Sequence, residues 1–234
     1  MIVQENVSLK SINTFGMNVS ARWYVAIQSK TDLQELFADK KIVANHFILG
    51  GGSNILFTKN INGFVVRNEL KGIEVLKEDA DYVYVKSGSG EVWHEFVLDC
   101  IRTDRAGVEN LSLIPGSVGA GPMQNIGAYG VELKDVFHEL EAFHLADGTT
   151  RNFSAEECKF GYRESVFKHE LKNQFFITSV TFRLRKKPVL NTSYGAIENE
   201  LKSLGITKIS IAAISQAVIN IRSSKLPDPK LIGN

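Results

Sequence analysis

Short apolar runs alternate with amphipathic segments along the first seventy residues, a pattern that predicts strands and helices in turn. Strands are expected over Trp23–Ile27, His46–Leu49 and Phe64–Val66. Between the first two, Leu33 and Leu36 share one face of a helix expected from Thr31 to Lys40. We therefore expect residues 1–68 to form a small α+β unit.

The pattern from residue 69 to 208 is richer in strand signals. The expected elements are a strand over Tyr82–Ser87, a helix over Glu91–Arg102, and strands over Glu139–Leu145 and Phe175–Leu184. Asp147-Gly148 predicts a hairpin, because such a tight turn needs a positive φ. Residues 69–208 are thus expected to form a second α+β unit.

The pattern becomes helical again near the end of the chain. Ile211, Ile214, Val218 and Ile221 recur at intervals of three and four residues, which predicts one apolar helix face. Pro227 is expected to end this helix. Residues 209–234 are therefore assigned to a helix and the start of a further domain.

Composition narrows the possible functions. The 234 residues include 27 basic and 26 acidic side chains, a net charge of +1, so nothing favours nucleic acid or a membrane surface as partner. Cys100 and Cys158 lie far apart and predict free thiols in a reducing compartment, without a metal site. The polar start indicates no signal peptide, and no apolar run suits a membrane helix. A cytoplasmic protein is expected.

Two glycine-rich loops are the main candidates for chemistry. Gly50-Gly51-Gly52-Ser53-Asn54 follows a predicted strand, and the segment 112–130 reads SLIPGSVGAGPMQNIGAYG. Neither matches a P-loop or the dinucleotide pattern G-x-G-x-x-G. A single loop of this kind is explained by a tight turn. Two loops together, with the amides of Gln124 and Asn125, favour an anionic cofactor held by backbone N–H groups.

Six motifs in order give the sequence a family resemblance. They are Asn13–Gly16, Leu49–Asn54, Ile114–Gly116, Gln124–Gly130, Gly161–Ser165 and Lys225–Pro229. Together they resemble type I UDP-N-acetylenolpyruvoylglucosamine reductase, a flavoenzyme of bacterial cell-wall precursor synthesis. The implied fold is α+β: an FAD-binding domain of the vanillyl-alcohol oxidase/PCMH type, with FAD between two α+β subdomains.

The resemblance implies the ligands and the residues that bind them. FAD would be bound non-covalently, NADPH would be the co-substrate, and the substrate would be a nucleotide sugar. The implied cofactor-binding residues are Leu49, Gly50, Gly51, Gly52, Ser53, Asn54, Pro115, Gly116, Gly119, Gln124, Asn125, Gly127, Ala128 and Tyr129. These glycine-rich loops would then run along the flavin and its diphosphate, where large side chains do not fit.

The implied reaction reduces the enolpyruvyl group of the substrate and needs stabilisation of an enolate-like charge. Arg163 is implied as the catalytic residue, since a guanidinium can bind a carboxylate with two hydrogen bonds. A capping box at Ser154 predicts a short helix, with Gly161 as its stop, that places Tyr162 and Arg163 in a turn. Outside this motif, a loop arginine would be interpreted as a surface charge.

Tyr162, Tyr194 and Lys225 are implied as substrate-binding residues. Tyr194 lies in a loop that closes over the diphosphate in type I members, although an ordinary loop aromatic would also explain it. Lys225 follows the apolar helix, where a cation is favoured by the helix dipole in any case.

The sequence departs from the family pattern at its last residue, Asn234. Family members continue with a serine proton donor, a substrate-binding domain and a late glutamate. We therefore interpret the chain as truncated and expect it to lack turnover by itself. The alternatives are a non-catalytic FAD-binding module and another flavin oxidoreductase of the same fold.

Overall fold

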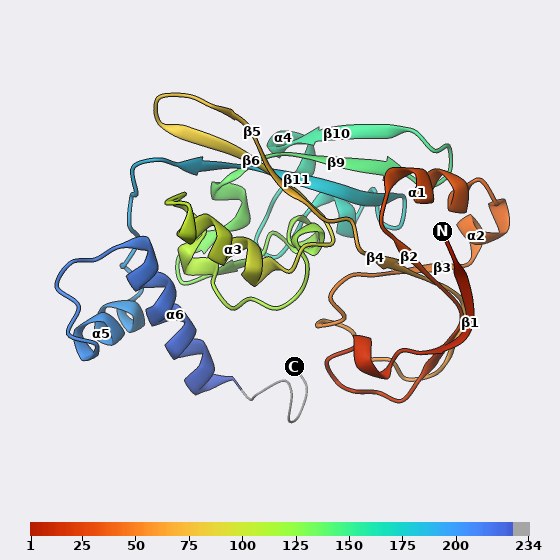
Figure 1. Cartoon of the computed structure of the whole chain (residues 1–234), viewed down its shortest axis with the longest axis horizontal. Coiled ribbons are helices and arrows are strands. Elements are labelled where there is room, and N and C mark those ends of the chain that lie inside the picture. Colours follow the sequence, from red (N-terminus) through yellow and green to blue (C-terminus); the bar gives the residue numbers. More distant parts are fainter. Residues whose placement is uncertain (227–234) are drawn as a thin grey trace.

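A computed structural model describes residues 1–226, which build two large β-sheets, a two-stranded sheet of β7 and β8, and several helices (Figure 1). Its strands are β1 Val3–Ser8, β2 Ser20–Ile27, β3 His46–Leu49, β4 Ile61–Asn68, β5 Ile73–Glu78, β6 Tyr82–Gly88, β7 Gly127–Ala128, β8 Val131–Glu132, β9 Phe137–His144, β10 Thr150–Ser154 and β11 Phe175–Arg185. The helices are α1 Lys30–Phe37, α2 Lys40–Ala44, α3 Trp93–Arg102, α4 Ala155–Cys158, α5 Gly195–Ser203 and α6 Ile211–Lys225. Short 3-10 turns are η1 Lys10–Ile12, η2 Glu109–Leu111, η3 Val118–Ala120, η4 Pro122–Gln124, η5 Leu133–Asp135 and η6 Val166–Lys168.

The first sheet has the strand order β1-β2-β4-β3. Strands β2 and β3 both run parallel to β4, and β1 adds an antiparallel edge. The parallel pairing of β3 with β4 sets Leu49 opposite Arg67. Because both strands end at the same sheet edge, the glycine-rich loop after Leu49 leaves the sheet beside Arg67.

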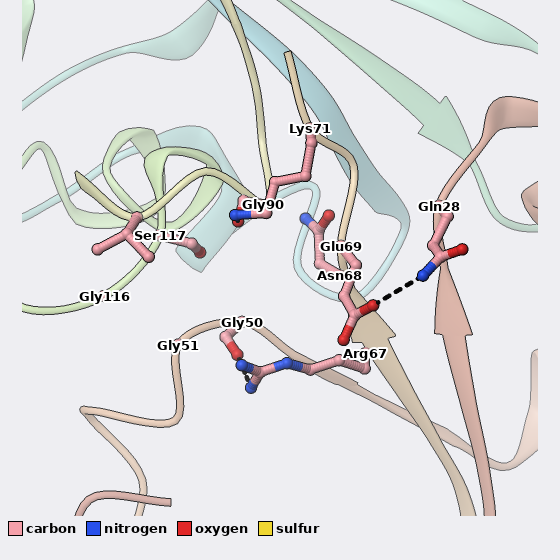
Figure 2. Close-up of a pocket in the computed structure, with 11 residues that line it drawn as sticks. Gln28, Gly50, Gly51, Arg67, Asn68, Glu69, Lys71, Gly90, Gly116 and Ser117 are labelled. Atoms are coloured by element: carbon pink, nitrogen blue, oxygen red, sulfur yellow. Dashed lines mark hydrogen bonds between the residues drawn. The ribbon is translucent and has the colours of Figure 1, made fainter. Parts of the chain in front are cut away.

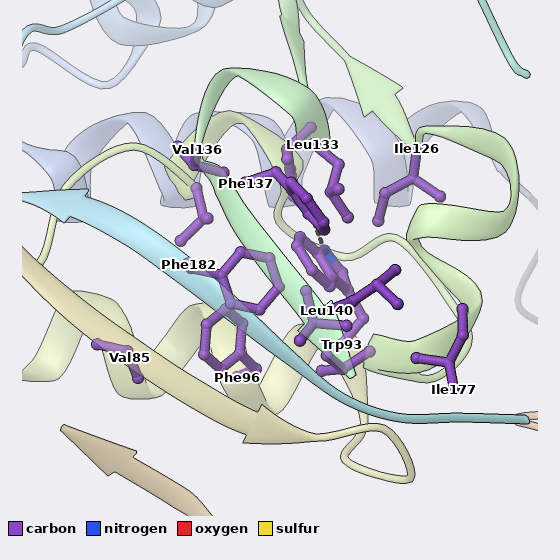
Figure 3. Close-up of a cluster of buried hydrophobic side chains, with 14 of the residues drawn as sticks. Val85, Trp93, Phe96, Ile126, Leu133, Val136, Phe137, Leu140, Ile177 and Phe182 are labelled. Atoms are coloured by element: carbon purple, nitrogen blue, oxygen red, sulfur yellow. Dashed lines mark hydrogen bonds between the residues drawn. The ribbon is translucent and has the colours of Figure 1, made fainter. Parts of the chain in front are cut away.

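The second sheet is antiparallel, in the order β10-β9-β11-β6-β5. One face packs on α3 and on the loops that follow it, through the fully buried rings of Trp93, Phe96 and Phe182 (Figure 3). The Phe96 and Phe182 ring centroids are 4.6 Å apart, and the Trp93 indole N–H donates to the Leu111 carbonyl at 2.9 Å. This core holds the second glycine loop against the sheet.

Most predicted elements are present, with shifted ends. The helix expected over residues 31–40 is α1, and it begins after Ser29 because Ser29 and Asp32 form a reciprocal capping box. It ends at Phe37, and α2 follows after Asp39. The capping box at Ser154 is confirmed.

The predicted helix stop at Gly161 is wrong. Helix α4 is capped at its C-terminal end by Lys159, which takes the left-handed conformation with φ 48°. Gly161 instead begins the turn that carries Arg163, and it pairs with Glu164. Pro227, the other predicted helix stop, lies outside the described residues.

A shared apolar core joins the two sheets. Val25, Ile27 and Leu33 of the first sheet and its helix pack with Phe143 and Phe176 of the second. Hydrophobic contacts therefore hold the two sheets together at one end of the cleft between them.

Polar contacts reinforce this junction. Lys30 Nζ on α1 lies 2.7 Å from a carboxylate oxygen of Glu141 on β9, and the hydroxyl of Thr178 donates to the same carboxylate at 2.5 Å. Burial raises the pKa of Glu141, but the hydrogen bonds from Lys30 and Thr178 outweigh burial and leave its pKa below the ordinary value.

Glu141→Gln is expected to lower the free energy of unfolding by about 1 kcal/mol at pH 7. The folded-state pKa of Glu141 is depressed, so its contribution exists above the unfolded pKa of about 4.3 and is lost as the pH falls. The two proteins should therefore converge in stability in acid. Urea unfolding from pH 7 to pH 3 measures this. Glu139→Gln, on the same strand, is the control, and a constant Glu141→Gln deficit at every pH would contradict the prediction.

Helices α5 and α6 pack together beside the second sheet, through Ile197 and Leu201 on one helix and Ile214 and Val218 on the other. The expected domain boundary at residue 208 stays a prediction, and this helix pair spans it. Within residues 1–226, no helix is long and apolar enough to cross a bilayer.

Candidate functional site

The two glycine-rich loops contact each other where the sheets meet. The first loop leaves β3, and the second passes from Pro115 into η3. A Cβ added to Gly51 would lie 2.8 Å from the Cα of Gly116, so only glycine permits this approach. Gly52, with φ +71°, is equally constrained, because its Cβ would lie 2.1 Å from the Ile12 carbonyl oxygen. Backbone packing therefore accounts for much of the glycine in these loops.

The same loops contain unpaired backbone donors. Among the described residues, no acceptor is hydrogen-bonded to the backbone N–H groups of residues 51–54, 116 and 117. The neighbouring carbonyls are used: Gly52 accepts from Thr14 at 3.1 Å and Gly116 accepts from Trp93 at 3.0 Å. Successive unpaired N–H groups form an anion-binding concavity of the kind that holds a diphosphate.

A cleft of about 630 Å³ opens at this junction. Of the residues expected to bind the cofactor, those lining it are Leu49, Gly50, Gly51, Gly52, Ser53, Asn54, Pro115, Gly116, Gln124 and Gly127. Arg163 lines it as well. Apolar walls are added by Phe47, Ile114 and Ile126, so the cleft can take a flat ring system at one end and an anion at the loops.

Two further cavities adjoin this cleft. One, of about 600 Å³, lies between β3 and the start of β11 and includes Phe47, Gly119 and Ile177. The other, of about 420 Å³, lies behind the glycine contact, where the Arg67 guanidinium donates to the Gly50 carbonyl and Lys71 Nζ donates to the Gly90 carbonyl at 2.6 Å (Figure 2). Arg67 thus holds the first glycine loop from behind.

Arg163 lies at the corner of a tight turn beside the cleft. Its φ is 58°, a conformation that non-glycine residues rarely adopt, and the turn is closed by hydrogen bonds between Gly161 and Glu164. One guanidinium nitrogen, Nη2, donates to the Gly127 carbonyl at 2.7 Å. Arg163 forms no ion pair with any described carboxylate, which leaves its charge available to a ligand.

A second arginine of the cleft, Arg222, was not predicted. It extends from α6, and its Nε donates to the Leu113 carbonyl at 3.1 Å. Burial lowers the pKa of Arg222 from its usual value, with Tyr129 acting in the opposite direction. The sequence did offer a signal for this residue. Arg222 follows Ile221 and so lies on the border of the apolar helix face, a position from which a basic side chain can point toward the core.

Several predicted residues do not line the cleft. The Asn125 side chain is buried and bonded within the protein, and Ala128 lies in β7. Tyr129 packs edge-on against Tyr194, with ring centroids 5.2 Å apart, so these two rings form one aromatic surface.

The remaining predicted residues are exposed. Tyr162 is 83% exposed, and Lys225 lies on the last turn of α6. The structure thus groups Arg163 with the loops and leaves the expected substrate residues around the rim. The rest of the Lys225–Pro229 motif, from Pro227 onward, lies outside the described residues.

The cysteines are remote from this chemistry. Cys100 and Cys158 are fully buried, and burial raises the pKa of both thiols, that of Cys158 to about 12. Among residues 1–226, no cluster of histidine, cysteine or acidic side chains could hold a metal ion.

Comparison with known proteins shows the family of the chain. A family profile described as FAD binding domain matches residues 21–154. The UDP-N-acetylenolpyruvoylglucosamine reductase of Amoebophilus asiaticus is 49% identical over 238 residues, which cover the whole chain and 69% of that relative.

Solved structures agree on the fold. The reductase structure from Thermus caldophilus superposes with a TM-score of 0.69 at 24% identity, over 97% of this chain and 72% of that one. A solvent-stable cholesterol oxidase gives a TM-score of 0.55 at 11% identity over 80% of this chain and 38% of that one. These two likenesses confirm the expected FAD-binding α+β fold. The high identity to the Amoebophilus asiaticus protein over the whole chain shows that the chain belongs to the UDP-N-acetylenolpyruvoylglucosamine reductase family.

Proposed function

We propose that this chain binds FAD between its two sheets and takes part in the NADPH-dependent reduction of the enolpyruvyl group of UDP-N-acetylglucosamine enolpyruvate, which yields UDP-N-acetylmuramate. The observation that carries the proposal is the charge of Arg163, held beside a cleft whose loops present unpaired backbone N–H groups. Membership of the reductase family supplies the substrate class.

The residues present fit FAD. The loops at 51–54 and 116–117 would hold its diphosphate through their backbone N–H groups, and the apolar walls at Phe47, Ile114 and Ile126 suit an aromatic ring system. Gln124 lines the same cleft and offers a side-chain amide. When bound, FAD accepts a hydride from NADPH and supplies it to the substrate.

Arg163 stabilises the charge that the reaction creates. When the methylene carbon of the enolpyruvyl group receives a hydride, negative charge develops on the neighbouring carbon and its carboxylate. A permanently charged guanidinium can bind that carboxylate through its planar edge. The hydrogen bond from Nη2 to the Gly127 carbonyl fixes the orientation of the plane before substrate arrives.

The rim residues are proposed to bind the nucleotide sugar. Tyr194 is half exposed and rests on Tyr129, so it can move over a diphosphate without losing a buried contact. Tyr162, whose ring centroid lies 6.0 Å from the Arg163 guanidinium carbon, offers a hydroxyl, and Lys225, at the end of the helix that carries Arg222, offers a cation. With this substrate, the protein would act in cytoplasmic peptidoglycan precursor synthesis, and so in cell-wall biogenesis, cell shape and cell division.

FAD is proposed to bind without a covalent bond. His46 adjoins the cleft, but its Nδ1 contacts the Ile42 and Val43 carbonyls at 3.2 and 3.0 Å, and both cysteines are buried in a core. His94 accepts a hydrogen bond from the Leu113 N–H at 3.0 Å. The described residues that line the cleft include no histidine and no cysteine, so no side chain of the kind that carries a covalent flavin meets it.

The protein expressed from the gene that encodes residues 1–234 is expected to copurify with FAD. Acid precipitation should release this FAD into the supernatant. Under anaerobic conditions, NADPH should bleach the flavin absorbance, and UDP-N-acetylglucosamine enolpyruvate should restore it. UDP-N-acetylglucosamine, which lacks the enolpyruvyl group, is the control. Flavin that is reoxidised by oxygen but not by the enolpyruvyl substrate would favour a different flavin oxidoreductase.

A further inference from the structure

The side chain of Asn125 lies between the cleft wall and the turn that carries Arg163. It is completely buried, and its Nδ2 donates to the Gly161 carbonyl at 2.9 Å and to a Glu132 carboxylate oxygen at 3.2 Å. Its Oδ1 accepts from the Lys134 backbone N–H at 3.0 Å. The carboxamide is therefore satisfied inside the protein, and it binds the turn rather than a ligand.

The backbone at Asn125 makes this placement possible. Its φ is 41°, a left-handed conformation that asparagine tolerates better than most residues. This turn directs the side chain inward, away from the cleft that the preceding Gln124 lines.

The segment 125–127 contacts the Arg163 turn at two points. Gly161, at the start of the turn, is held by the Asn125 carboxamide, and the Arg163 guanidinium is held by the Gly127 carbonyl. Arg163 itself takes the left-handed φ of 58°, which persists only when surrounding contacts enforce it. Residues 125–127 therefore hold the start of the turn and the Arg163 side chain, while Lys168 Nζ donates to the Arg163 carbonyl at 2.9 Å.

We propose that Asn125 is a positioning residue that holds Arg163 toward the cleft by binding the Gly161 carbonyl and restraining Glu132. The effect of Asn125 on the reaction rate rests on the proposed function, whereas its effect on the position of Arg163 does not. Without the carboxamide, the Gly161 carbonyl keeps only the 3.4 Å contact from the Glu164 N–H, and the turn can relax. Glu132 keeps Lys134 but loses one of its two donors, so its carboxylate attracts the Arg163 guanidinium more strongly.

The surroundings of Glu132 support this restraint. Lys134 Nζ lies 2.7 Å from Oε2 of Glu132, the same oxygen that accepts from Asn125 Nδ2, so two donors hold one oxygen of the carboxylate. The hydrogen bonds from Lys134 and Asn125 outweigh burial and lower the pKa of Glu132, with a smaller contribution from the Arg163 charge. Glu132 is thus ionised, and the two donors on its Oε2 compete with Arg163 for its charge.

The first test reads the position of Arg163 without any catalysis. Asn125→Gly removes the carboxamide and still permits the positive φ, and Asn125→Asp keeps the acceptor for Lys134 but removes both donors. In each variant of the 234-residue chain, the Arg163 Nε–H cross-peak in a ¹⁵N NMR spectrum should shift or broaden. Asn6→Gly, at an exposed position with φ 53°, should leave it unchanged. An unmoved Arg163 cross-peak in both Asn125 variants would overturn the proposal.

The second test asks whether Asn125 acts through Arg163. In the gene product, Asn125→Gly should slow flavin reoxidation by the enolpyruvyl substrate roughly 10-fold, with reduction by NADPH unchanged. Added to Arg163→Lys, it should cause no further loss, because the contact it supports is already gone. Independent, multiplying losses would show that Asn125 acts elsewhere. If the gene product reduces no enolpyruvyl substrate, the proposed function fails, and the NMR result still decides the role of Asn125.

Discussion

Arg163→Lys is expected to slow reoxidation of the reduced flavin by the enolpyruvyl substrate roughly 100-fold or more, while reduction by NADPH stays unchanged. Lysine keeps the positive charge but loses the planar pair of donors that binds a carboxylate. It also loses the 2.7 Å hydrogen bond from Nη2 to Gly127 that fixes the side chain beside the cleft. Stopped-flow measurement of the two half-reactions separates these steps.

The control for charge and length is Arg102→Lys. Arg102 is exposed on α3, pairs with Asp99 and does not line the cleft. It should leave both half-reactions unchanged. If Arg163→Lys slowed both half-reactions equally, its role would be in folding or flavin placement rather than in stabilising charge on the substrate.

Gly51→Ala is expected to raise the dissociation constant for FAD roughly 10- to 100-fold, the cost of about 1–3 kcal/mol for overpacking a close contact. The new Cβ would lie 2.8 Å from the Cα of Gly116, and a backbone atom cannot move aside as a flexible side chain can. The two loops must separate, and their N–H groups would then no longer converge on one anion. Titration of the apoprotein with FAD, followed by flavin fluorescence, measures the effect.

Gly195→Ala is the matched control. Gly195 begins α5, and a Cβ there would meet nothing within 4 Å. FAD affinity should be unchanged, and alanine should stabilise the helix slightly. A thermal melt of each apoprotein distinguishes a local loop effect from unfolding. An unchanged affinity in Gly51→Ala would show that FAD binding does not need the contact between the loops.

The sequence was sufficient to predict those helices and strands whose form depends mainly on their own residues. The apolar face of α6 and the alternation in β6 follow from the periodicity of their own residues. The edge strands β1 and β5 were not predicted, because nearly every side chain in them is exposed and neither shows an apolar face. Their pairing comes from backbone hydrogen bonds to β2 and β6, which no side-chain pattern reveals.

The sequence by itself determined the family and the two glycine loops and made Arg163 the candidate for catalysis, because these reside in short motifs whose residues are contiguous. The tertiary structure decided how they are used. It brought Gly51 against Gly116, which are 65 positions apart by their numbers, and turned Asn125 away from the cleft. It also added Arg222 and Arg67, whose roles come from neighbours distant in the chain. Contacts of this kind depend on how the two sheets pack, and a motif records only which residues are present, not which of them meet.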